Sequence, residues 1–581
     1  MEQQRNLIIA VVISIAILIG FEYFIAPKVK PTAHPPAQTQ GQVAQPGTGK
    51  TAAVPAAPSG VSAPAPVTRD AALGKSTRIK ISTPRLVGSI DLTGARLDDL
   101  TLTNYRETTT PNSPLVQLLS PDTTADPYFA DFGWVAGDSA VKVPNTSTTW
   151  QSSDKLLGVD HPVTLTWDNG AGLLFKRTIA VDADYMFTVT QTVTNHGGKP
   201  VTLFPYGRIN RGGKTPVQSN RLLHVGPLGV LDGTLHEMSY TDLAADKPTQ
   251  IKTTGGWFGL TDEYWLTSLI PDQSEPIEAR FTKVPRAQGD LYQIDFTGNA
   301  HALAPGATVT TSDRLFAGAK EVHLLDDYEA QLHIPRFDRA IDFGWFYFLT
   351  KPIFLLLDFF YRHIGNFGLA ILLFTLCVKV LFFPLANRSY RSMSKMKLLQ
   401  PEMAKLKERF GGDRERMNQE TMALYKRSGA NPAAGCLPIV IQIPVFFSLY
   451  KVLSVTIEMR QAPFYGWIHD LSVPDPTTVL NLFGLLPWTV PAHLPLIGFL
   501  SIGAWPLIMG VTMFLQQKMT PTSPDPTQAK MMLALPVVFT FMLASFPAGL
   551  VIYWAWNNTL SIAQQWLILR QVSAQKTPAK A

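Results

Sequence analysis

Cysteine is scarce in this chain, which has only 2 cysteines among 581 residues. Both of them, Cys377 and Cys436, fall in apolar segments that we predict to span a membrane. Disulfides therefore cannot hold the water-facing part of the chain together, and the spacing of the two thiols does not suggest a metal site.

Acidic residues are missing from the middle of every apolar segment long enough to cross a bilayer. The nearest acids, Glu22 and Glu458, lie near segment ends. Lys379 is nevertheless found inside the almost wholly apolar run Phe367 to Ala386. A charge at membrane depth costs about 2.5 to 3.5 kcal/mol, so it persists where it faces a partner or a watery cavity. We therefore expect Lys379 to line a hydrated recess; snorkelling toward the headgroups near Arg388 is the alternative.

Catalytic signatures are also missing from the water-facing half of the chain. His236 and Glu237 begin a zinc-protease motif, but Tyr240 stands where the second histidine is required. His196, His224 and Glu237 could form an acid/base set only if the fold brought them together. We therefore predict no catalytic residues, no metal site and no cofactor, and a protein that is not an enzyme.

Apolar residues are abundant, at 46% of the chain against 16% charged residues, which suits a membrane bundle with a soluble domain. The formal net charge is +6. Basic residues are concentrated between Arg388 and Arg427, a block that lies between two predicted spans. The positive-inside rule places this block in the cytoplasm, so the basic composition does not indicate a specific nucleic-acid partner.

From about Ser76 to Pro335 the apolar residues recur at every second position, as a half-buried strand requires. Phe187 and Val189, for example, alternate with threonines, and Asp168-Asn169-Gly170 separates two such runs as a hairpin turn would. This region predicts one large antiparallel β-sandwich, which lies outside the cytoplasm because one span precedes it.

The whole pattern predicts a multi-domain membrane protein with an α-helical bundle of six transmembrane helices, an outer β-sandwich, a cytoplasmic helical hairpin and both termini in the cytoplasm. The predicted segments are an N-terminal transmembrane anchor at 1–26, a disordered Pro/Ala-rich linker at 27–75, the β-sandwich at 76–335, an amphipathic interface helix at 336–362, transmembrane helix 2 at 363–387, the hairpin at 388–431, transmembrane helices 3 to 6 at 432–570 and a basic tail at 571–581.

Polar residues recur within the predicted spans. Thr375 lies four residues before Lys379 and therefore on the same helical face. Three other spans carry amides and hydroxyls at Gln442, at Thr512 and Gln516, and at Asn557 and Asn558. Ordinary hydrogen bonding between helices explains any one of them. Together with the unpaired Lys379, the set predicts a groove that holds the polar part of a passing segment.

The cytoplasmic block contains helix formers on both sides of Gly411-Gly412, which predicts a helical hairpin. Its apolar residues recur at helical intervals and form a soft, adaptable surface suited to capturing varied apolar segments. These residues are Met393, Met396, Met417, Met422 and Tyr425. A solvated charged hairpin without a partner is the alternative.

Several stretches closely resemble the YidC family of membrane protein insertases, over essentially the whole chain. The resemblance is carried by Gln419–Lys426, Asn431-Pro432, Gly435–Pro438, Gln442, Pro444 and Phe446, and by the segments "FGWFYFLTKP", "GVTMFLQQKMTP" and "FPAGLVIYW". A match in so many parts, in the expected order, is highly specific.

The resemblance implies a five-helix core behind an N-terminal anchor, a periplasmic β-sandwich and a hydrophilic groove open to the cytoplasm and to lipid. It implies that Lys379 occupies the position of the family's conserved positive charge, where many relatives have arginine. Lysine offers a point charge there instead of the planar, bidentate guanidinium of arginine. The implied partners are nascent membrane proteins, the Sec translocon, the ribosome and signal-recognition targeting machinery, and membrane lipids. The implied location is the bacterial inner membrane, as a multi-pass protein.

Two other functions compete with insertion of nascent membrane proteins. A secondary transporter would show internal repeats, and no repeat relates the halves of this chain. A membrane-anchored carbohydrate-binding or carbohydrate-processing protein would need convergent acid/base residues in the β-sandwich.

Overall fold

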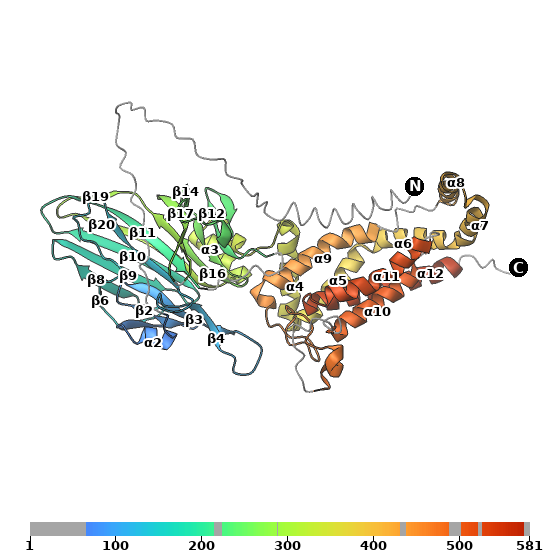
Figure 1. Cartoon of the computed structure of the whole chain (residues 1–581), viewed down its shortest axis with the longest axis horizontal. Helices are drawn as coiled ribbons and strands as arrows, with labels where there is room; N and C mark the ends of the chain where they lie inside the picture. Colours follow the sequence, from blue (N-terminus) through green and yellow to red (C-terminus); the bar gives the residue numbers. More distant parts are fainter. Residues whose placement is uncertain are drawn as a thin grey trace, which may run out of the picture. The chain divides into compact units, whose positions relative to one another are not determined.

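The computed structural model describes residues 66–213, 223–287, 289–429, 437–486, 501–520 and 526–574. The predicted N-terminal anchor, most of the linker and most of the basic tail lie outside these residues. All described residues belong to one compact unit, Val54–Ala581. Within it, the short helix α2 (Arg69–Leu73) precedes the strands, which extend along the chain to Ala319, and most of the helices follow (Figure 1).

Two sheets form the strand-rich part. The 11-stranded sheet contains, in sheet order, β14 (Thr249–Thr254), β17 (Pro276–Val284), β18 (Leu291–Thr297), β11 (Val201–Arg211), β5 (Tyr128–Ala136), β3 (Arg96–Arg106), β2 (Leu86–Asp91), β1 (Arg78–Ser82) and β7 (Leu156–Leu157), with β19 (His301–Leu303) beside β11 and β4 (Leu115–Leu119) beside β3. The 9-stranded sheet contains β13 (Thr234–Glu237), β12 (Gly226–Leu231), β15 (Trp257–Thr261), β16 (Trp265–Ile270), β20 (Thr308–Ala319), β10 (Met186–Asn195), β9 (Leu173–Val181), β8 (Val163–Asp168) and β6 (Gln151–Ser152).

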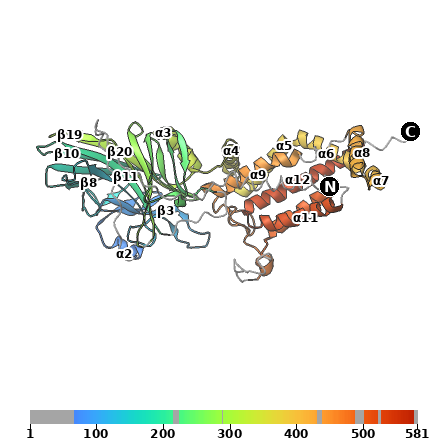
Figure 2. The same ribbon diagram turned by 45° about the horizontal axis from the view of Figure 1, so that its top comes forward.

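The two sheets pack face to face, which confirms the predicted sandwich (Figure 2). The ring of Phe258 in β15 lies 5.8 Å from that of Phe281 in β17 and 6.4 Å from that of Phe296 in β18. Burial alternates along β10 as expected, with Phe187 and Val189 buried between half-buried threonines. Pairing is antiparallel among the described strands except between β1 and β7, which run parallel.

Four charged residues lie in register across neighbouring strands of the 11-stranded sheet. Arg280 on β17 is opposite Asp295 on β18, which is opposite Arg208 on β11, which is opposite Asp131 on β5. We call this row the charge ladder. Its end pairs are close, at 3.1 Å between Arg280 Nη2 and Asp295 Oδ1 and 2.8 Å between Arg208 Nη2 and Asp131 Oδ2. Neighbours in the ladder alternate in sign, so the buried carboxylates lie beside cations.

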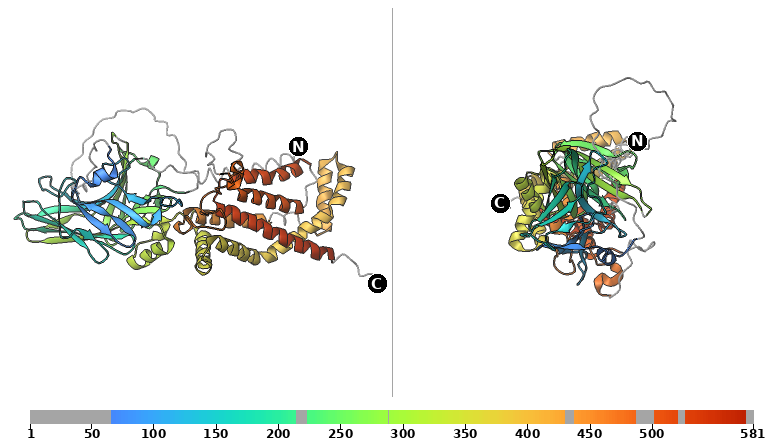
Figure 3. Two further views of the ribbon diagram at one scale, coloured as in Figure 1. Left: turned by 90° about the horizontal axis from the view of Figure 1, so that it is seen from below. Right: turned by 90° about the vertical axis from the view of Figure 1, so that its left-hand side faces the viewer.

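Helices follow the sandwich. They are α3 (Val322–Leu332), α4 (Tyr347–Ile364), α5 (Phe367–Leu381), α6 (Phe383–Leu398), α7 (Gln400–Phe410), α8 (Arg414–Arg427), α9 (Leu437–Val455), α10 (Ala504–Met519), α11 (Pro526–Leu543) and α12 (Ala548–Ala574). Helix α12 packs on α5, α6, α9 and α10, and α10 also packs on α11 (Figure 3, left). This puts α12 at the centre of the helical part.

Among the described helices, none taken singly combines the length and the apolar character that a membrane crossing requires. Helices α5 and α6 meet both requirements only as a pair, with a bend of 68° between them.

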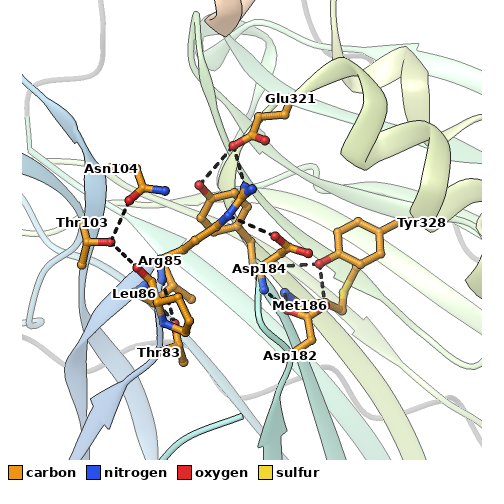
Figure 4. A network of polar contacts seen from close by, with 12 residues as sticks. Thr83, Arg85, Leu86, Thr103, Asn104, Asp182, Asp184, Met186, Glu321 and Tyr328 are labelled. Carbon is orange, nitrogen blue, oxygen red and sulfur yellow. Dashed lines mark hydrogen bonds and ion pairs between the residues drawn. The ribbon is translucent and has the colours of Figure 1, made fainter.

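Helix α3 is tied to the sandwich through Glu321, the residue before it (Figure 4). Glu321 Oε1 accepts hydrogen bonds from Arg85 Nη1 at 2.8 Å, from Tyr105 Oη at 2.8 Å and from Tyr185 Oη at 3.3 Å. Glu458, just after α9, reaches the same point, because its Oε1 accepts the backbone N–H of Val322 at 2.8 Å. Burial raises the pKa of Glu458 to about 8.

Some predicted boundaries differ from the structure. The end of the predicted linker contains a short helix, α2 (Arg69–Leu73), which Thr68 caps by accepting the Ala71 N–H and which Arg69 ties to Asp99 on β3 through an ion pair. The predicted span that contains Lys379 is bent, because α5 ends at Leu381 and Pro384 lies in the first turn of α6. The predicted fourth span becomes helical at Ala504, after extended backbone at Gly503.

Candidate functional site

The site is centred on Lys379, in the last turn of α5. Lys379 is half-buried and its Nζ donates a hydrogen bond to Ser561 Oγ on α12, at 2.7 Å. The Ser561 hydroxyl in turn donates to the backbone oxygen of Asn557, at 2.8 Å. No carboxylate of the described residues forms an ion pair with Lys379. An ammonium has three donors, and a single hydroxyl occupies only one of them.

A polar stripe on α12 surrounds this contact. It consists of Asn557, Asn558, Ser561, Gln564 and Gln565, each at most 9% exposed. Their spacing of three and four residues puts them on one helical face. The Gln564 Nε2 and the Gln565 Oε1 are buried and have no hydrogen-bond partner in the described part of the chain. Buried amides usually find partners, so the stripe retains unused hydrogen-bonding capacity.

The structure brings several of the predicted groove residues to α12. Gln442 on α9 donates through Nε2 to the hydroxyl of Tyr553, and the Asn558 amide lies 3.4 Å from Thr512 Oγ1 on α10. Gln516 lies one turn after Thr512 and is half-buried. Helices α5, α9, α10 and α12 therefore all contribute polar side chains to one region.

Thr375 contributes less than predicted. It is buried one turn before Lys379, but its hydroxyl donates to the backbone oxygen of Ile371 within its own helix, at 2.7 Å. A threonine that bonds four residues back satisfies its own donor. The face of α5 beyond Lys379 is apolar and open, with Val380 66% and Leu381 71% exposed.

Ser561, the hydrogen-bond partner of Lys379, was not predicted from the sequence, and neither were Tyr553 and the two glutamines of the stripe. A signal for most of them was available. Ser561 and Gln564 continue the helical spacing of Asn557 at four and seven residues. Which of those polar positions faces Lys379 depends on how α5 crosses α12, and spacing within one helix does not carry that information.

The candidate capture residues lie on three helices. Met393 and Met396 are half-buried on α6, Met417, Met422 and Tyr425 are on α8, and α7 lies between these helices in the chain. Helices α7 and α8 pack on each other on either side of Gly411-Gly412, and Tyr425 Oη contacts Met403 Sδ at 3.2 Å. Met422 is 50% exposed.

The acid/base set considered for the β-sandwich does not assemble. His224 lies near Glu237, whose pKa is raised by burial and lowered in part by that histidine. His196 instead follows the end of β10 and its backbone pairs with Gly172. Within the described ranges no cluster of His, Cys, Asp and Glu suits a metal ion.

Two family models match the chain. One, described as the YidC periplasmic domain, matches residues 78–356, and the other, described as 60Kd inner membrane protein, matches residues 359–576. Together they cover the sandwich and the helices.

Curated relatives are similar over nearly the full length. The chain is 51% identical to "Membrane protein insertase YidC" of Rhizobium meliloti over 98% of this chain and 96% of that protein. It is 50% identical to the protein of the same name from Granulibacter bethesdensis over 98% of both. A solved structure described as an active YidC insertase with its first transmembrane domain resolved covers 86% of this chain and 94% of its own, at 17% identity and a TM-score of 0.37.

Proposed function

The chain belongs to the YidC family of membrane protein insertases, and we propose that it passes the polar part of each client along the stripe of α12 beside Lys379. It is a membrane protein insertase of the bacterial inner membrane with a large periplasmic β-sandwich. Family membership removes the reason to consider a transporter or a carbohydrate-processing protein.

The observation that carries the proposal is the single hydroxyl contact of Lys379. A cation held by a neutral hydroxyl keeps its charge uncompensated, so an incoming carboxylate gains an ion pair without breaking an existing one. The buried, unpartnered amide groups of Gln564 and Gln565 offer a donor and an acceptor to polar backbone on the same face. These groups lower the cost of bringing a hydrophilic tail into an apolar surrounding.

In this account the acidic or polar tail of a client enters the groove formed by Lys379, Thr375, Gln442, Thr512, Gln516 and Asn557. The tail then moves outward while the apolar segment passes into lipid along exposed side chains such as Val380. The membrane potential assists an acidic tail by about 2.3 kcal/mol per charge per 100 mV. No chemical reaction is catalysed and no nucleotide is consumed.

We place six transmembrane helices in the chain, with both termini and the α7–α8 hairpin in the cytoplasm. The basic residues of the hairpin support that side. The methionines at 393, 396, 417 and 422, with Tyr425, receive the client before the groove does, since flexible thioethers adapt to varied apolar segments. The Sec translocon, the ribosome and the signal-recognition targeting machinery are the partners we propose for delivery.

The test compares Lys379→Ala with Lys379→Arg in a reconstituted insertion assay, using one client with an acidic translocated tail and one with a neutral tail. We expect the alanine variant to insert the acidic client roughly tenfold more slowly, equivalent to about 1.4 kcal/mol. The arginine variant should insert it at a near wild-type rate, because the charge is kept. Equal insertion of the acidic client by the alanine variant would refute the role of Lys379.

A further inference from the structure

A patch of large apolar side chains protrudes between α9 and α10. It is formed by residues 479–486, which we call the apolar finger: the turn Val479–Gly484 followed by Leu485 and Leu486. Leu482 is 52% exposed, Phe483 43%, Leu485 83% and Leu486 43%. Single exposed apolar residues are ordinary, but four within five positions mark a surface that contacts something apolar.

The finger has a strained backbone. Leu482 (φ 48°, ψ 48°) and Phe483 (φ 58°, ψ 35°) both adopt the left-handed conformation, which bulky residues rarely occupy. Local hydrogen bonds hold the turn, because Asn481 Oδ1 accepts from Thr478 N at 3.2 Å and from Gly484 N at 3.0 Å. Such strain costs free energy and persists at positions that serve a function.

The finger is also fixed to the start of α10. Asp475 Oδ2 accepts the backbone N–H of Trp505 at 2.9 Å, and Thr477 Oγ1 accepts that of Ala504 at 3.0 Å. These two residues just before the finger therefore cap α10. A side chain at Gly503 would meet Asp475, since a Cβ there would lie 2.6 Å from the carboxyl carbon. The finger is therefore joined to this helix end through Asp475 and Thr477.

The residues around the apolar finger indicate which environment the finger contacts. From Pro476 to Gln517 the chain contains no Asp, Glu, Lys or Arg. Surfaces for protein partners usually carry charged residues around their apolar centre, and this stretch has none. Trp467 and Tyr465, shortly before it, are 41% and 63% exposed, and such aromatic residues favour the boundary between lipid and water.

We propose that the apolar finger inserts Leu482, Phe483, Leu485 and Leu486 into the acyl region of the outer leaflet and anchors the outer end of α10. The partner is the lipid itself. The inference depends on the proposed function only for the choice of leaflet. The apolar finger would give the helices around Lys379 a second attachment to the outer membrane surface. The first is provided by the exposed aromatic residues of α4, such as Phe348 and Phe359.

The experiment uses the full chain with Cys377 and Cys436 replaced by serine and with Leu485→Cys labelled by an environment-sensitive fluorophore, in lipid nanodiscs. We expect blue-shifted emission, stronger quenching by nitroxides near the glycerol end of the acyl chains than by nitroxides near the terminal methyl, and little quenching by aqueous iodide. The control, Thr110→Cys in the exposed β3–β4 loop, should give water-like emission and be quenched by iodide.

Iodide quenching at Leu485 equal to that at Thr110 would overturn the proposal, and so would a shielded label that lipid nitroxides do not quench, since a protein then covers it. Asn481→Ala, which loosens the turn, should reduce lipid quenching of the same label; unchanged quenching would contradict the role of the strained turn. A membrane-impermeant reductant added outside sealed vesicles reports the leaflet, and so tests the proposed topology separately.

Discussion

Charged residues are buried in the β-sandwich and half-buried in the helical part, and their partners differ. In the β-sandwich, the charge ladder sets Arg208 between Asp131 and Asp295 on adjacent strands. In the helical part, Lys379 meets a serine hydroxyl. A charge paired with an opposite charge serves the stability of the fold, because removing either one leaves the other buried without a partner. A half-buried charge held by a single neutral group remains available to a client.

Lys320, at the end of the sandwich, shows that a buried lysine can also be satisfied without a carboxylate. Its Nζ donates to Thr261 Oγ1 at 2.9 Å and to the backbone oxygen of Asp262 at 2.7 Å. Lys320 is 2% exposed, and burial lowers its pKa to about 8. Lys379 has one neutral acceptor where Lys320 has two, and it is less buried.

The largest expected effect is on stability, from Arg208→Leu. Leaving Asp131 buried without its cation should destabilise the sandwich by about 3 to 5 kcal/mol. The measurement is pulse proteolysis of the full chain in nanodiscs across a urea series. Lys379→Leu, the matched change in the helical part, should not lower stability, because it leaves no opposite charge buried without a partner. If both changes destabilise equally, the contrast between the two halves is wrong.

A smaller effect is expected from Glu458→Gln, at the junction with α3. Burial raises the pKa of Glu458 to about 8, above its unfolded value of about 4.3. The folded state therefore binds the proton more tightly, and the stability it contributes is present at acid pH and lost as pH rises toward 8. Amides of α3 should exchange hydrogen more readily at pH 9 than at pH 6, after correction for intrinsic rates.

The Gln variant should abolish this pH dependence, because its amide is neutral and its oxygen can still accept the Val322 N–H. Asp327→Asn, on the exposed side of α3, is the control and should retain the dependence. The same slope in wild type and in Glu458→Gln would show that another group titrates.

The smallest effect is expected from Ser561→Ala, which removes the 2.7 Å contact with Lys379. A hydrogen bond to a charged group contributes about 1.5 to 3 kcal/mol at most, and Lys379 keeps its charge. Insertion of an acidic client should slow severalfold, less than in Lys379→Ala, and Ser561→Thr should restore it. Thr559→Ala, on an exposed part of the same helix, should have no effect. A loss that adds fully to that of Lys379→Ala would mean that Ser561 does not act through Lys379.

The sandwich was predictable because strand burial has a period of two. The alternation around Phe187 and the turn at Asp168-Asn169-Gly170 both reappear, with β8 and β9 paired from Asp168 opposite Leu174. The charge ladder was not predicted, since it depends on which strands become neighbours: β11 lies between β5 and β18, far from both in sequence.

The helical site was predictable in part. An isolated lysine in an apolar run can be recognised from the sequence, because the free-energy cost of placing its charge in a membrane depends on the apolar residues around it. Its partner cannot be recognised in this way, since Ser561 lies 182 residues away and reaches Lys379 only because α5 crosses α12. The apolar finger was missed for a related reason: its strain and exposure come from backbone angles that apolar residues do not signal.

The most direct test of the central claim asks whether position 379 faces water. Lys379→Cys and Val380→Cys are placed in a chain with Cys377 and Cys436 replaced by serine, and the rate of labelling by a charged, membrane-impermeant thiol reagent is measured in nanodiscs. The account predicts fast labelling at position 379, which it places in the hydrated groove, and slow labelling at position 380, which it places against lipid. Equally slow labelling at both positions would contradict it.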